Sequence, residues 1–538
     1  ERVYRPTERK GRMGKRETIS VCRRIERRRQ SCINHGIFKK ITAMDSTIYL
    51  QTKKGNGYLY DNRHSCMINC HPVIQTIFEL SQHNNDTTEL FRQIKNGYPE
   101  LSFNDIEYYY SKYQFFKSNG LFTDIDMEQY LSGKISAETV KVQLANVSIV
   151  VFQVTNLCNL NCTYCCYGDM YENTDRDVSC NVMDFSRAKK VLDFLYERWN
   201  SEMNISQNSD IMIGFYGGEP LTNFSLIQQI IEYTQSLHLK NGAIFKYNMT
   251  TNAMLLDKYM SYLEKYKVNL LISLDGNQVH NSYRIDKQGN PSFNKVFHNI
   301  KSLKEKYPIY FEKQVQFNSV LNNNSDVISV QKFIFDEFGK NTGIEQIASA
   351  GIKKEKKQLF KELYRPYILP IETEQNRKRN SRELKDIGFF FYYHMGNSYC
   401  HYIDLIISEN ENQPRLPTGT CLPFSRKVFI TPSGGIYPCE RIGFKHILGK
   451  VTENMNINYE QVAEKYNSFY SAIAKQCMHC YNADSCGACF MQFELKDGIP
   501  FCNSMMSKEE FQNYLTDMIS YLEVNPDSYI EINKMVFA

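Results

Sequence analysis

The feature that most constrains the fold is an alternation of strand-like and helix-like segments between residues 147 and 350. Six short runs rich in β-branched and aromatic residues alternate with segments whose apolar residues recur at helical spacing, which predicts parallel βα units. Since six units are too few to close an eight-stranded barrel, we expect an α/β fold with a partial (β/α)6 barrel over 146–350, and functional groups in the loops after its strands. The predicted helices are 184–199, 222–238, 255–266, 292–306 and 325–338.

The region before this alternation predicts a separate module over residues 44–140. Three strand-like stretches lie within 47–70, and helical patterns follow. This order of strands and helices is typical of a small winged-helix-like module. The predicted helices of the module lie within 71–82, 86–94 and 102–122.

Charge separates the first residues from the rest of the chain. Residues 1–43 carry a net charge of +10, whereas the whole chain of 538 residues carries +5. We expect this segment to be a basic disordered extension, and the net negative remainder argues against a nucleic-acid partner. Neither a run of 18 apolar residues nor a secretory signal is recognisable, so we expect a cytoplasmic protein without a membrane partner.

Three further segments follow the alternating region. Residues 351–399 are charged and predict a helical linker, residues 400–510 are rich in turn residues and cysteine, and residues 511–538 predict a C-terminal helix. The chain has 17 cysteines. Many of them cluster at short spacings, which is typical of metal or iron–sulfur ligation.

Cys158, Cys162 and Cys165 stand close together directly after the first predicted strand. A loop at that place directs three thiolates to one side. A cubane 4Fe–4S cluster usually takes four cysteines, so three ligands leave one iron free to bind a small molecule through an amine and a carboxylate. A zinc site or chance spacing is the alternative explanation.

This arrangement resembles the radical S-adenosylmethionine (SAM) superfamily. Four further stretches match that family in order and position, namely GFYGGEP, MTTNA, SLDGNQVHNSYR and QFNSVL. The resemblance implies a 4Fe–4S cluster on Cys158, Cys162 and Cys165, with SAM on its open iron. The SAM contacts that it implies are Gly217, Gly218, Glu219, Ser273, Arg284 and Asn318.

The later cysteines resemble the SPASM domain, an auxiliary-cluster module of enzymes that modify peptides and proteins. Gly434 and Cys439 have the family spacing, whereas Cys486 and Cys489 stand one residue closer than usual. The resemblance implies two auxiliary 4Fe–4S clusters, one of which lacks an evident fourth ligand unless the distant Cys400 supplies it. Structural zinc is the alternative, since these spacings also suit tetrahedral thiolate sites. The implied ligands are Cys477, Cys480, Cys486 and Cys502 for one cluster, and Cys421, Cys439 and Cys489 for the other.

Taken together, the chain is similar to radical SAM/SPASM maturases of ribosomally made peptides, of the kind common in Bacteroidetes. The family implies reductive cleavage of SAM to a 5′-deoxyadenosyl radical. It also implies oxidative modification of a precursor peptide, as a thioether or a carbon–carbon crosslink. The module over 44–140 would bind the leader of that peptide at a sheet edge. An electron donor such as flavodoxin or ferredoxin is a further implied partner.

Two other functions stay open. One is that of an anaerobic sulfatase-maturating enzyme, which generates formylglycine; in such relatives an Asp at the position of Glu440 takes a proton from the substrate. Glu440 is therefore a candidate catalytic base, while an ion pair with Arg441 or a nearby lysine explains it equally well. The other is a non-catalytic protein that binds zinc or a peptide.

Overall fold

The computed structural model describes nine stretches of the chain. The basic segment 1–42, most of the predicted linker and Cys400 lie outside them, so what was predicted for those residues stays a prediction. Within the described stretches, no helix is long and apolar enough to cross a membrane. The described residues are 43–62, 66–81, 86–122, 124–171, 182–206, 209–349, 351–365, 414–496 and 498–528.

Six parallel strands form the centre of the structure and follow one another in sequence order. Every neighbouring pair from β6 to β11 is parallel, so all six carboxyl ends lie at one edge of the sheet. The prediction of six parallel βα units is confirmed. The strands are β6 (Ile149–Thr155), β7 (Ile211–Gly217), β8 (Phe245–Thr251), β9 (Asn269–Ser273), β10 (Val315–Leu321) and β11 (Thr342–Gln346).

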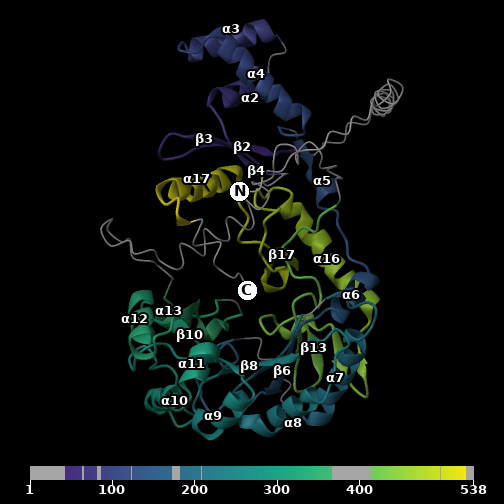
Figure 1. Cartoon of the computed structure of the whole chain (residues 1–538), viewed down its shortest axis with the longest axis vertical. Coiled ribbons are helices and arrows are strands. Elements are labelled where there is room, and N and C mark those ends of the chain that lie inside the picture. Colours follow the sequence, from purple (N-terminus) through teal and green to yellow (C-terminus); the bar gives the residue numbers. More distant parts are fainter. Residues whose placement is uncertain are drawn as a thin grey trace, which may run out of the picture.

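Amphipathic helices connect these strands and surround the sheet (Figure 1). In α8 the buried residues Leu226, Ile227 and Ile230 recur at helical spacing, and this apolar face packs into the main core. All five predicted helices are present, but the sequence did not predict α11, in which Pro308 takes the first position. The helices are α7 (Phe185–Trp199), α8 (Phe224–Gln235), α9 (Leu256–Lys265), α10 (Phe293–Lys306), α11 (Pro308–Gln314) and α12 (Val327–Phe338).

The cysteine-rich segment adds four strands to the same sheet. β12 runs parallel to β6, with Phe429 opposite Val151, and β13 to β15 continue the sheet in antiparallel fashion. All three side chains of β12 are buried, so the burial of apolar surface accounts for its place beside β6. The cysteine-rich segment, as described from residue 414 onward, therefore shares its sheet with the predicted barrel. The added strands are β12 (Val428–Ile430), β13 (Gly435–Tyr437), β14 (Gly449–Val451) and β15 (Met455–Asn456).

The described residues up to Phe122 form a module at one end of the molecule (Figure 1). The elements that follow leave it: α6 (Ala137–Ala145) packs on α16 (Tyr459–Cys477), and Ile135 and Val140 belong to the main core, so the module ends before the predicted boundary at residue 140. Three antiparallel strands pair in sequence order, and three helices share one buried core with them. The predicted strands and helices of this module are confirmed, whereas its winged-helix character stays a prediction. The elements are β1 (Ala43–Asp45), β2 (Thr47–Gln51), β3 (Gly57–Asp61), β4 (Cys66–Asn69), α2 (Val73–Ser81), α3 (Thr87–Gly97) and α4 (Phe103–Ser118), followed by β5 (Asp124–Asp126), α5 (Met127–Tyr130) and α6 (Ala137–Ala145).

The helix α17 (Lys508–Val524) packs on the sheet of this module. Phe511 and Leu515 of the helix form one buried cluster with Ile48 and Leu50 of β2. Part of the predicted C-terminal helix is therefore present, but α17 ends at Val524, and residues 529–538 lie outside the described residues. The helix covers a sheet formed by residues from the other end of the chain.

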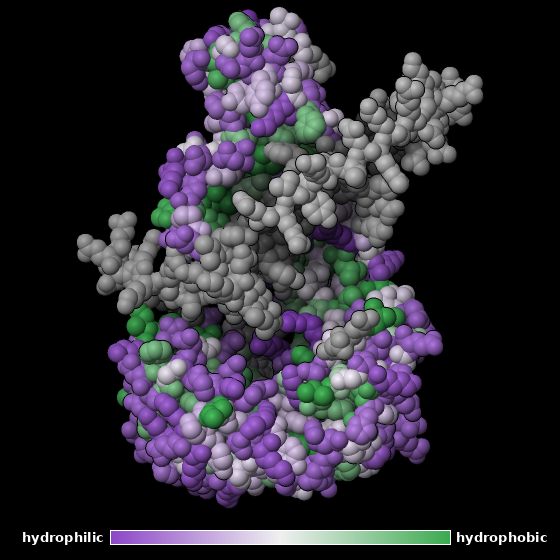
Figure 2. Space-filling view, in the orientation of Figure 1, coloured by the Kyte–Doolittle hydropathy of each residue, from purple (hydrophilic) through white to green (hydrophobic). Residues whose placement is uncertain are grey.

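Among the described residues, the remaining α-helices and strands lie in two places: α13 falls within the predicted linker, and α16, β16 and β17 belong to the cysteine-rich region. Figure 2 shows that the surface of the sheet-bearing half is mainly hydrophilic in this view, with hydrophobic residues scattered among the polar ones. Such scatter is ordinary for a folded protein. The elements are α13 (Lys357–Leu363), α16 (Tyr459–Cys477), β16 (Glu494–Lys496) and β17 (Ile499–Phe501).

Candidate active site

The loop after β6 carries the first three cysteines and lies at the carboxyl edge of the sheet. Two backbone hydrogen bonds hold it against the loop after β9. Asn161 N donates to Ile285 O at 2.8 Å, and Thr163 N donates to Tyr283 O at 3.1 Å. The cysteines are therefore placed where parallel strands usually present functional groups.

The three thiols of this loop lie within electrostatic range of one another. Burial raises the pKa of Cys162 to about 12, Arg284 lowers it, and Cys165 and Cys158 add to the increase. A backbone N–H of the loop lies 3.4 Å from the Cys158 sulfur, and Nδ2 of Asn252 lies 3.7 Å from it. Three neighbouring sulfurs, one of which has two N–H donors beside it, are a donor set that fits an iron–sulfur cluster.

Gly217 and Gly218 allow the end of β7 to approach the cysteine loop very closely. Gly217 has a φ of +142°, and a Cβ atom there would lie 2.2 Å from the carbonyl oxygen of Thr155. A Cβ atom on Gly218 would lie 2.2 Å from the carbonyl oxygen of Leu157. Because only glycine fits at these positions, the backbone of the predicted SAM-binding motif is held directly beside the start of the cysteine loop.

The buried carboxylate of Glu219 ties the ends of β7 and β8 together. Its Oε1 accepts hydrogen bonds from Thr251 Oγ1 at 2.8 Å and from Leu221 N at 3.1 Å, and its Oε2 accepts one from Asn252 N at 2.8 Å. Burial raises the pKa of Glu219 to about 7, although these hydrogen bonds oppose the increase. The carboxylate is thus engaged with its own chain, and its contact with SAM stays a prediction.

Asp275 connects the loop after β9 to the cysteine loop and to β10. Its Oδ1 accepts hydrogen bonds from Arg284 Nη2 at 2.8 Å and from Val320 N at 2.9 Å, and its Oδ2 accepts one from the hydroxyl of Tyr164. Nε of Arg284 is buried and has no hydrogen-bond partner among the described residues. A buried donor without a partner, beside Cys162, fits an anionic group such as the carboxylate of SAM.

Ser273 and Asn318 lie opposite each other at the same edge of the sheet, paired in the parallel register of β9 and β10. The structure therefore brings all six predicted SAM contacts to the carboxyl edge that carries the cysteine loop. His280, in the loop after β9, packs on the backbone of that loop. A Cβ atom on Gly276 would lie 2.4 Å from Nδ1 of His280. Roles of these residues toward SAM stay predictions.

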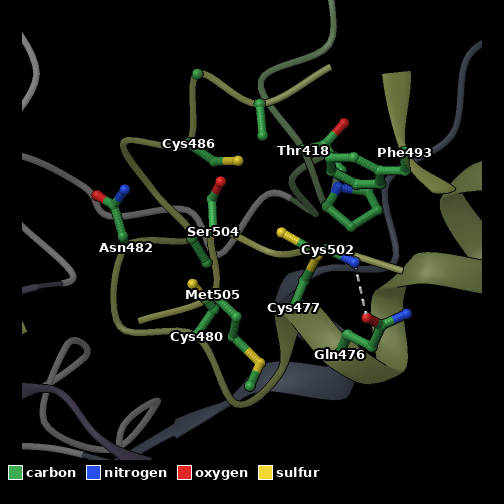
Figure 3. Close-up of a pocket in the computed structure, with 14 residues that line it drawn as sticks. Thr418, Gln476, Cys477, Cys480, Asn482, Cys486, Phe493, Cys502, Ser504 and Met505 are labelled. Atoms are coloured by element: carbon green, nitrogen blue, oxygen red, sulfur yellow. Dashed lines mark hydrogen bonds between the residues drawn. The ribbon is translucent and has the colours of Figure 1, made fainter. Parts of the chain in front are cut away.

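A second group of cysteines encloses a cavity of about 280 Å³ (Figure 3). The sulfurs of Cys477, Cys480, Cys486 and Cys502 face this space, and the backbone N–H of Met506 lies 3.4 Å from the Cys480 sulfur. Burial and the neighbouring Cys486, Cys480 and Cys502 raise the pKa of Cys477 to about 12. The four thiols that were predicted to share one cluster thus line one cavity, which fits a bound group with four sulfur ligands. In the described part of the chain, no three His, Cys, Asp or Glu side chains are close enough to bind one metal ion directly.

The third group of cysteines surrounds two tyrosines of α16. The thiols of Cys421, Cys439 and Cys489 all lie within electrostatic range of the Tyr466 hydroxyl. Burial raises the pKa of Cys439, and the charges of Glu440 and Cys489 add to the increase. These three cysteines were predicted to share a cluster, and they lie in one neighbourhood. Their predicted fourth ligand, Cys400, lies outside the described residues.

Gly419 holds the two later groups of cysteines together. A Cβ atom on Gly419 would lie 1.5 Å from the carbonyl oxygen of Cys486, so the loop before Cys421 packs directly on the loop that carries Cys486. Thr420 strengthens this contact, because its Oγ1 accepts a hydrogen bond from Phe490 N at 2.9 Å. Gly419 was not predicted from the sequence to have a role, although it stands only two residues before a predicted ligand.

Glu440 forms an ion pair beside the third group of cysteines. Both of its carboxylate oxygens accept hydrogen bonds from Nζ of Lys427, at 3.0 and 3.1 Å. The sequence offered an ion pair as the alternative to a catalytic base, and Lys427, not Arg441, supplies the cation. Burial raises the pKa of Tyr216, and the nearby Cys166 and Glu440 raise it further. The ion pair of Glu440 and Lys427 therefore lies near the end of β7. Catalysis by Glu440 stays a prediction.

Comparisons with known proteins identify part of the chain. Residues 152–316 match the family model of the Radical SAM superfamily. An uncharacterized protein of Methanocaldococcus jannaschii is 34% identical over 144 residues, which are 27% of this chain and 44% of that protein. The radical SAM cyclopropyl synthase TigE of Paramaledivibacter caminithermalis is 26% identical over 215 residues, which are 37% of this chain and 40% of TigE. The cysteine-type anaerobic sulfatase-maturating enzyme of Clostridium novyi is 26% identical over 186 residues, which are 34% of this chain and 46% of the enzyme.

The chain thus matches less than half the length of each of these relatives. Among solved structures, AdoMet-bound anSMEcpe aligns with a TM-score of 0.44 at 17% identity, over 73% of this chain and 96% of that chain. SuiB of Streptococcus suis aligns with a TM-score of 0.34 at 13% identity, over 79% of this chain and 88% of that chain. The matched stretch runs from β6 into β10 and includes the first three cysteines, so residues 152–316 correspond to a radical SAM domain and are similar to part of known radical SAM synthases and sulfatase-maturating enzymes.

Proposed function

We propose that this chain cleaves S-adenosylmethionine and oxidatively modifies a ribosomally made peptide, forming a thioether or a carbon–carbon crosslink. The observation that carries the proposal is the cavity enclosed by Cys477, Cys480, Cys486 and Cys502. It lies in a segment whose strands continue the radical SAM sheet. A second sulfur-lined site beside a radical SAM domain fits the SPASM resemblance, and SPASM enzymes modify peptides and proteins.

The residues of the first site have separate tasks in this proposal. Bound there, SAM and its cluster would supply a radical that removes a hydrogen atom from the substrate, while auxiliary clusters would supply an acceptor for the second electron. The backbone at Gly217 and Gly218 would approach the amine of SAM. Arg284 would hold its carboxylate through Nε, since Asp275 already engages Nη2. These groups orient SAM and exclude water from it.

The N-terminal sheet offers an edge for a leader peptide. Among the described strands, β4 pairs with β3 alone. Cys70 N donates to Gly57 O, and Leu59 pairs with Ile68. The alternation of an antiparallel pair therefore directs the backbone N–H of the exposed Asn69 away from β3. An extended peptide can add there as a further strand.

The main test is metal analysis and SAM cleavage by the anaerobically reconstituted full-length protein. Three cubanes predict about twelve iron atoms per chain, and flavodoxin or ferredoxin would serve as the reductant. Replacing Cys158, Cys162 and Cys165 by alanine should leave about eight iron atoms and abolish 5′-deoxyadenosine formation. Cys166→Ala is the matched control, because this thiol adjoins Cys165 and is not a proposed ligand. Zinc in place of iron would refute the proposal.

Co-expression with a short reading frame that encodes a leader-like N-terminus, if the neighbourhood of the gene contains one, tests the substrate class. Each crosslink should remove two hydrogen atoms from the encoded peptide, which intact-mass spectrometry detects. Leader binding is tested by fluorescence anisotropy with Asn69→Pro, which removes the outward N–H, against Asn69→Ala, which keeps it. Equal affinities of the two variants would exclude β4 as the binding edge.

Formylglycine generation in a sulfatase is a second candidate function. The similarity to sulfatase-maturating enzymes and the position of Glu440 beside Cys439 favour it. Incubation with a sulfatase-derived cysteine peptide distinguishes the two functions, because only this activity yields an aldehyde product. Glu440→Gln should then abolish the aldehyde, whereas Lys427→Met should retain a carboxylate and part of the activity.

A further inference from the structure

Helix α16 directs two buried tyrosines toward the third group of cysteines. Tyr466 is 0% exposed and Tyr470 is 2% exposed, and their spacing of four residues places them on one face of the helix. Cys477 follows Tyr470 by seven residues and lies on the same face, at the cavity of the second group. Neither tyrosine hydroxyl has a hydrogen-bond partner among the described residues. Each of these two buried O–H donors needs an acceptor, and the described residues do not supply one.

Ring contacts fix where these hydroxyls lie. Both tyrosine rings meet the ring of Phe490 edge to face, each at 5.5 Å between centroids. Phe490 follows Cys489 directly, and its backbone N–H donates to Thr420, which directly precedes Cys421. The tyrosines are thus packed against both loops that carry the thiols.

The electrostatic surroundings agree with this placement. After burial, the groups that raise the pKa of Tyr466 are Tyr470, Cys489, Cys421 and Cys439. For Tyr470, burial is followed by Cys421 and Cys489. All three cysteines of the group are therefore near the Tyr466 hydroxyl.

We propose that the hydroxyls of Tyr466 and Tyr470 donate hydrogen bonds to sulfur atoms of the iron–sulfur cluster held by Cys421, Cys439 and Cys489. This inference rests on the proposed function, since it requires that cluster. Hydrogen bonds to cluster and thiolate sulfurs are one of the means by which a protein sets a reduction potential. A donor stabilises the reduced form more, because that form carries the additional negative charge, and so it raises the potential. The two tyrosines are positioning and tuning residues that need not touch the peptide.

The test is an EPR-monitored redox titration of the reconstituted full-length holoenzyme. Tyr466→Phe and Tyr470→Phe keep the ring contacts with Phe490 and remove only the hydroxyls. Each variant should retain the iron content of the wild type and shift the midpoint potential of this one cluster to a more negative value. The double variant should shift it further.

Tyr310→Phe is the matched control. This tyrosine is also buried, but its hydroxyl donates to Val268 O in the main core, so its loss should leave all potentials unchanged. Unchanged potentials in Tyr466→Phe and Tyr470→Phe would overturn the inference. Loss of iron from Tyr466→Phe would also overturn it, because the phenol would then be a ligand.

Cys421→Ala separates this inference from the proposed function. If the third cluster exists, that variant loses its EPR signal and about four iron atoms relative to the wild type. If the wild-type protein itself lacks the signal, the auxiliary cluster and the tyrosine hydrogen bonds are both refuted. If the cluster is present and the tyrosine variants behave as the wild type, only the tyrosine inference fails.

Discussion

Arg284 donates a hydrogen bond from Nη2 to Oδ1 of Asp275 at 2.8 Å, and both side chains are almost completely buried. The carboxylate also binds the hydroxyl of Tyr164 and the backbone of β10. One buried ion pair thus fixes the cysteine loop and the guanidinium that is proposed to hold SAM.

Asp275→Asn should therefore destabilise the protein strongly. The variant keeps the shape of the side chain but leaves the buried guanidinium without its counter-charge, a change that typically costs about 3–5 kcal/mol. Denaturant unfolding measures the loss. The exposed pair of Lys53 and Asp517 is the control, and Asp517→Asn should cost less than about 1 kcal/mol. Equal losses in the two variants would contradict the role of the buried pair.

Gly217→Ala should weaken SAM binding about tenfold or more. The added methyl group would lie 2.2 Å from Thr155 O, so β7 must move away from the cysteine loop. Gly289→Ala is the control for backbone strain, because Gly289 has a φ of +88° but open space around it. Equilibrium dialysis with SAM compares the two variants, and similar affinities would show that the close approach is unimportant for binding.

Gly419→Ala should lower the content of auxiliary iron while the first cluster remains. The methyl group would lie 1.5 Å from Cys486 O, so the loops that carry Cys421 and Cys486 must separate. Gly443→Ala is the control, since nothing lies within 4 Å of its Cβ position and Gly443 does not line the cavity. Iron analysis of both reconstituted variants measures the effect, and full iron content in Gly419→Ala would count against a shared support.

Glu219 predicts a pH dependence of stability in the cofactor-free protein. Its pKa is about 7 in the folded protein against an ordinary value of 4.5, so the folded state binds this proton more tightly than the unfolded state. The resulting stabilisation, about 3 kcal/mol, is fully present below about pH 4.5 and is lost as the pH rises through about 7. Urea unfolding at several pH values should show this decrease in the wild type and a smaller one in Glu219→Gln. Identical slopes would rule out Glu219 as the source.

Leu515→Ala should loosen the contact between α17 and the N-terminal sheet. Leu515 is fully buried against β2, and its truncation should cost about 2–5 kcal/mol. Val524→Ala in the same helix is the control, because Val524 is 61% exposed and should matter by less than about 0.5 kcal/mol. Hydrogen exchange of β2 and β3 amides should become faster only in Leu515→Ala.

The sequence was sufficient for the local elements of the parallel sheet. Strands such as β6 are apolar runs buried on both faces, and helices such as α8 carry one apolar face, so the periodicity of the sequence predicts both. The grouping of the later cysteines came from the resemblance to the SPASM domain and not from their spacing alone. Cys477, Cys480, Cys486 and Cys502 do line one cavity.

Relations between distant segments were not predictable in the same way. The pairing of β12 with β6 and the packing of α17 on β2 join residues that are hundreds of positions apart, and no local pattern specifies such partners. The sequence predicted that Glu440 could pair with Arg441 or with a nearby lysine, but not with which one. In the structure its partner is Lys427. From the sequence, Tyr466 and Tyr470 are expected to be ordinary core residues. Helical periodicity predicts that a side chain is buried, but it does not predict which groups surround its hydroxyl.

The position of α17 has a consequence for biosynthesis. Oγ of Ser520 in this helix accepts a hydrogen bond from the backbone N–H of Lys53, which is translated 467 residues earlier. While the ribosome translates the intervening chain, the apolar face that includes Ile48 and Leu50 has no helix to cover it. The nascent N-terminal module therefore exposes this apolar surface to solvent until α17 has been synthesised. Transiently exposed apolar surface promotes aggregation, so we expect chaperones to bind the nascent module. Proteolytic removal of α17 from the mature protein would recreate that nascent condition.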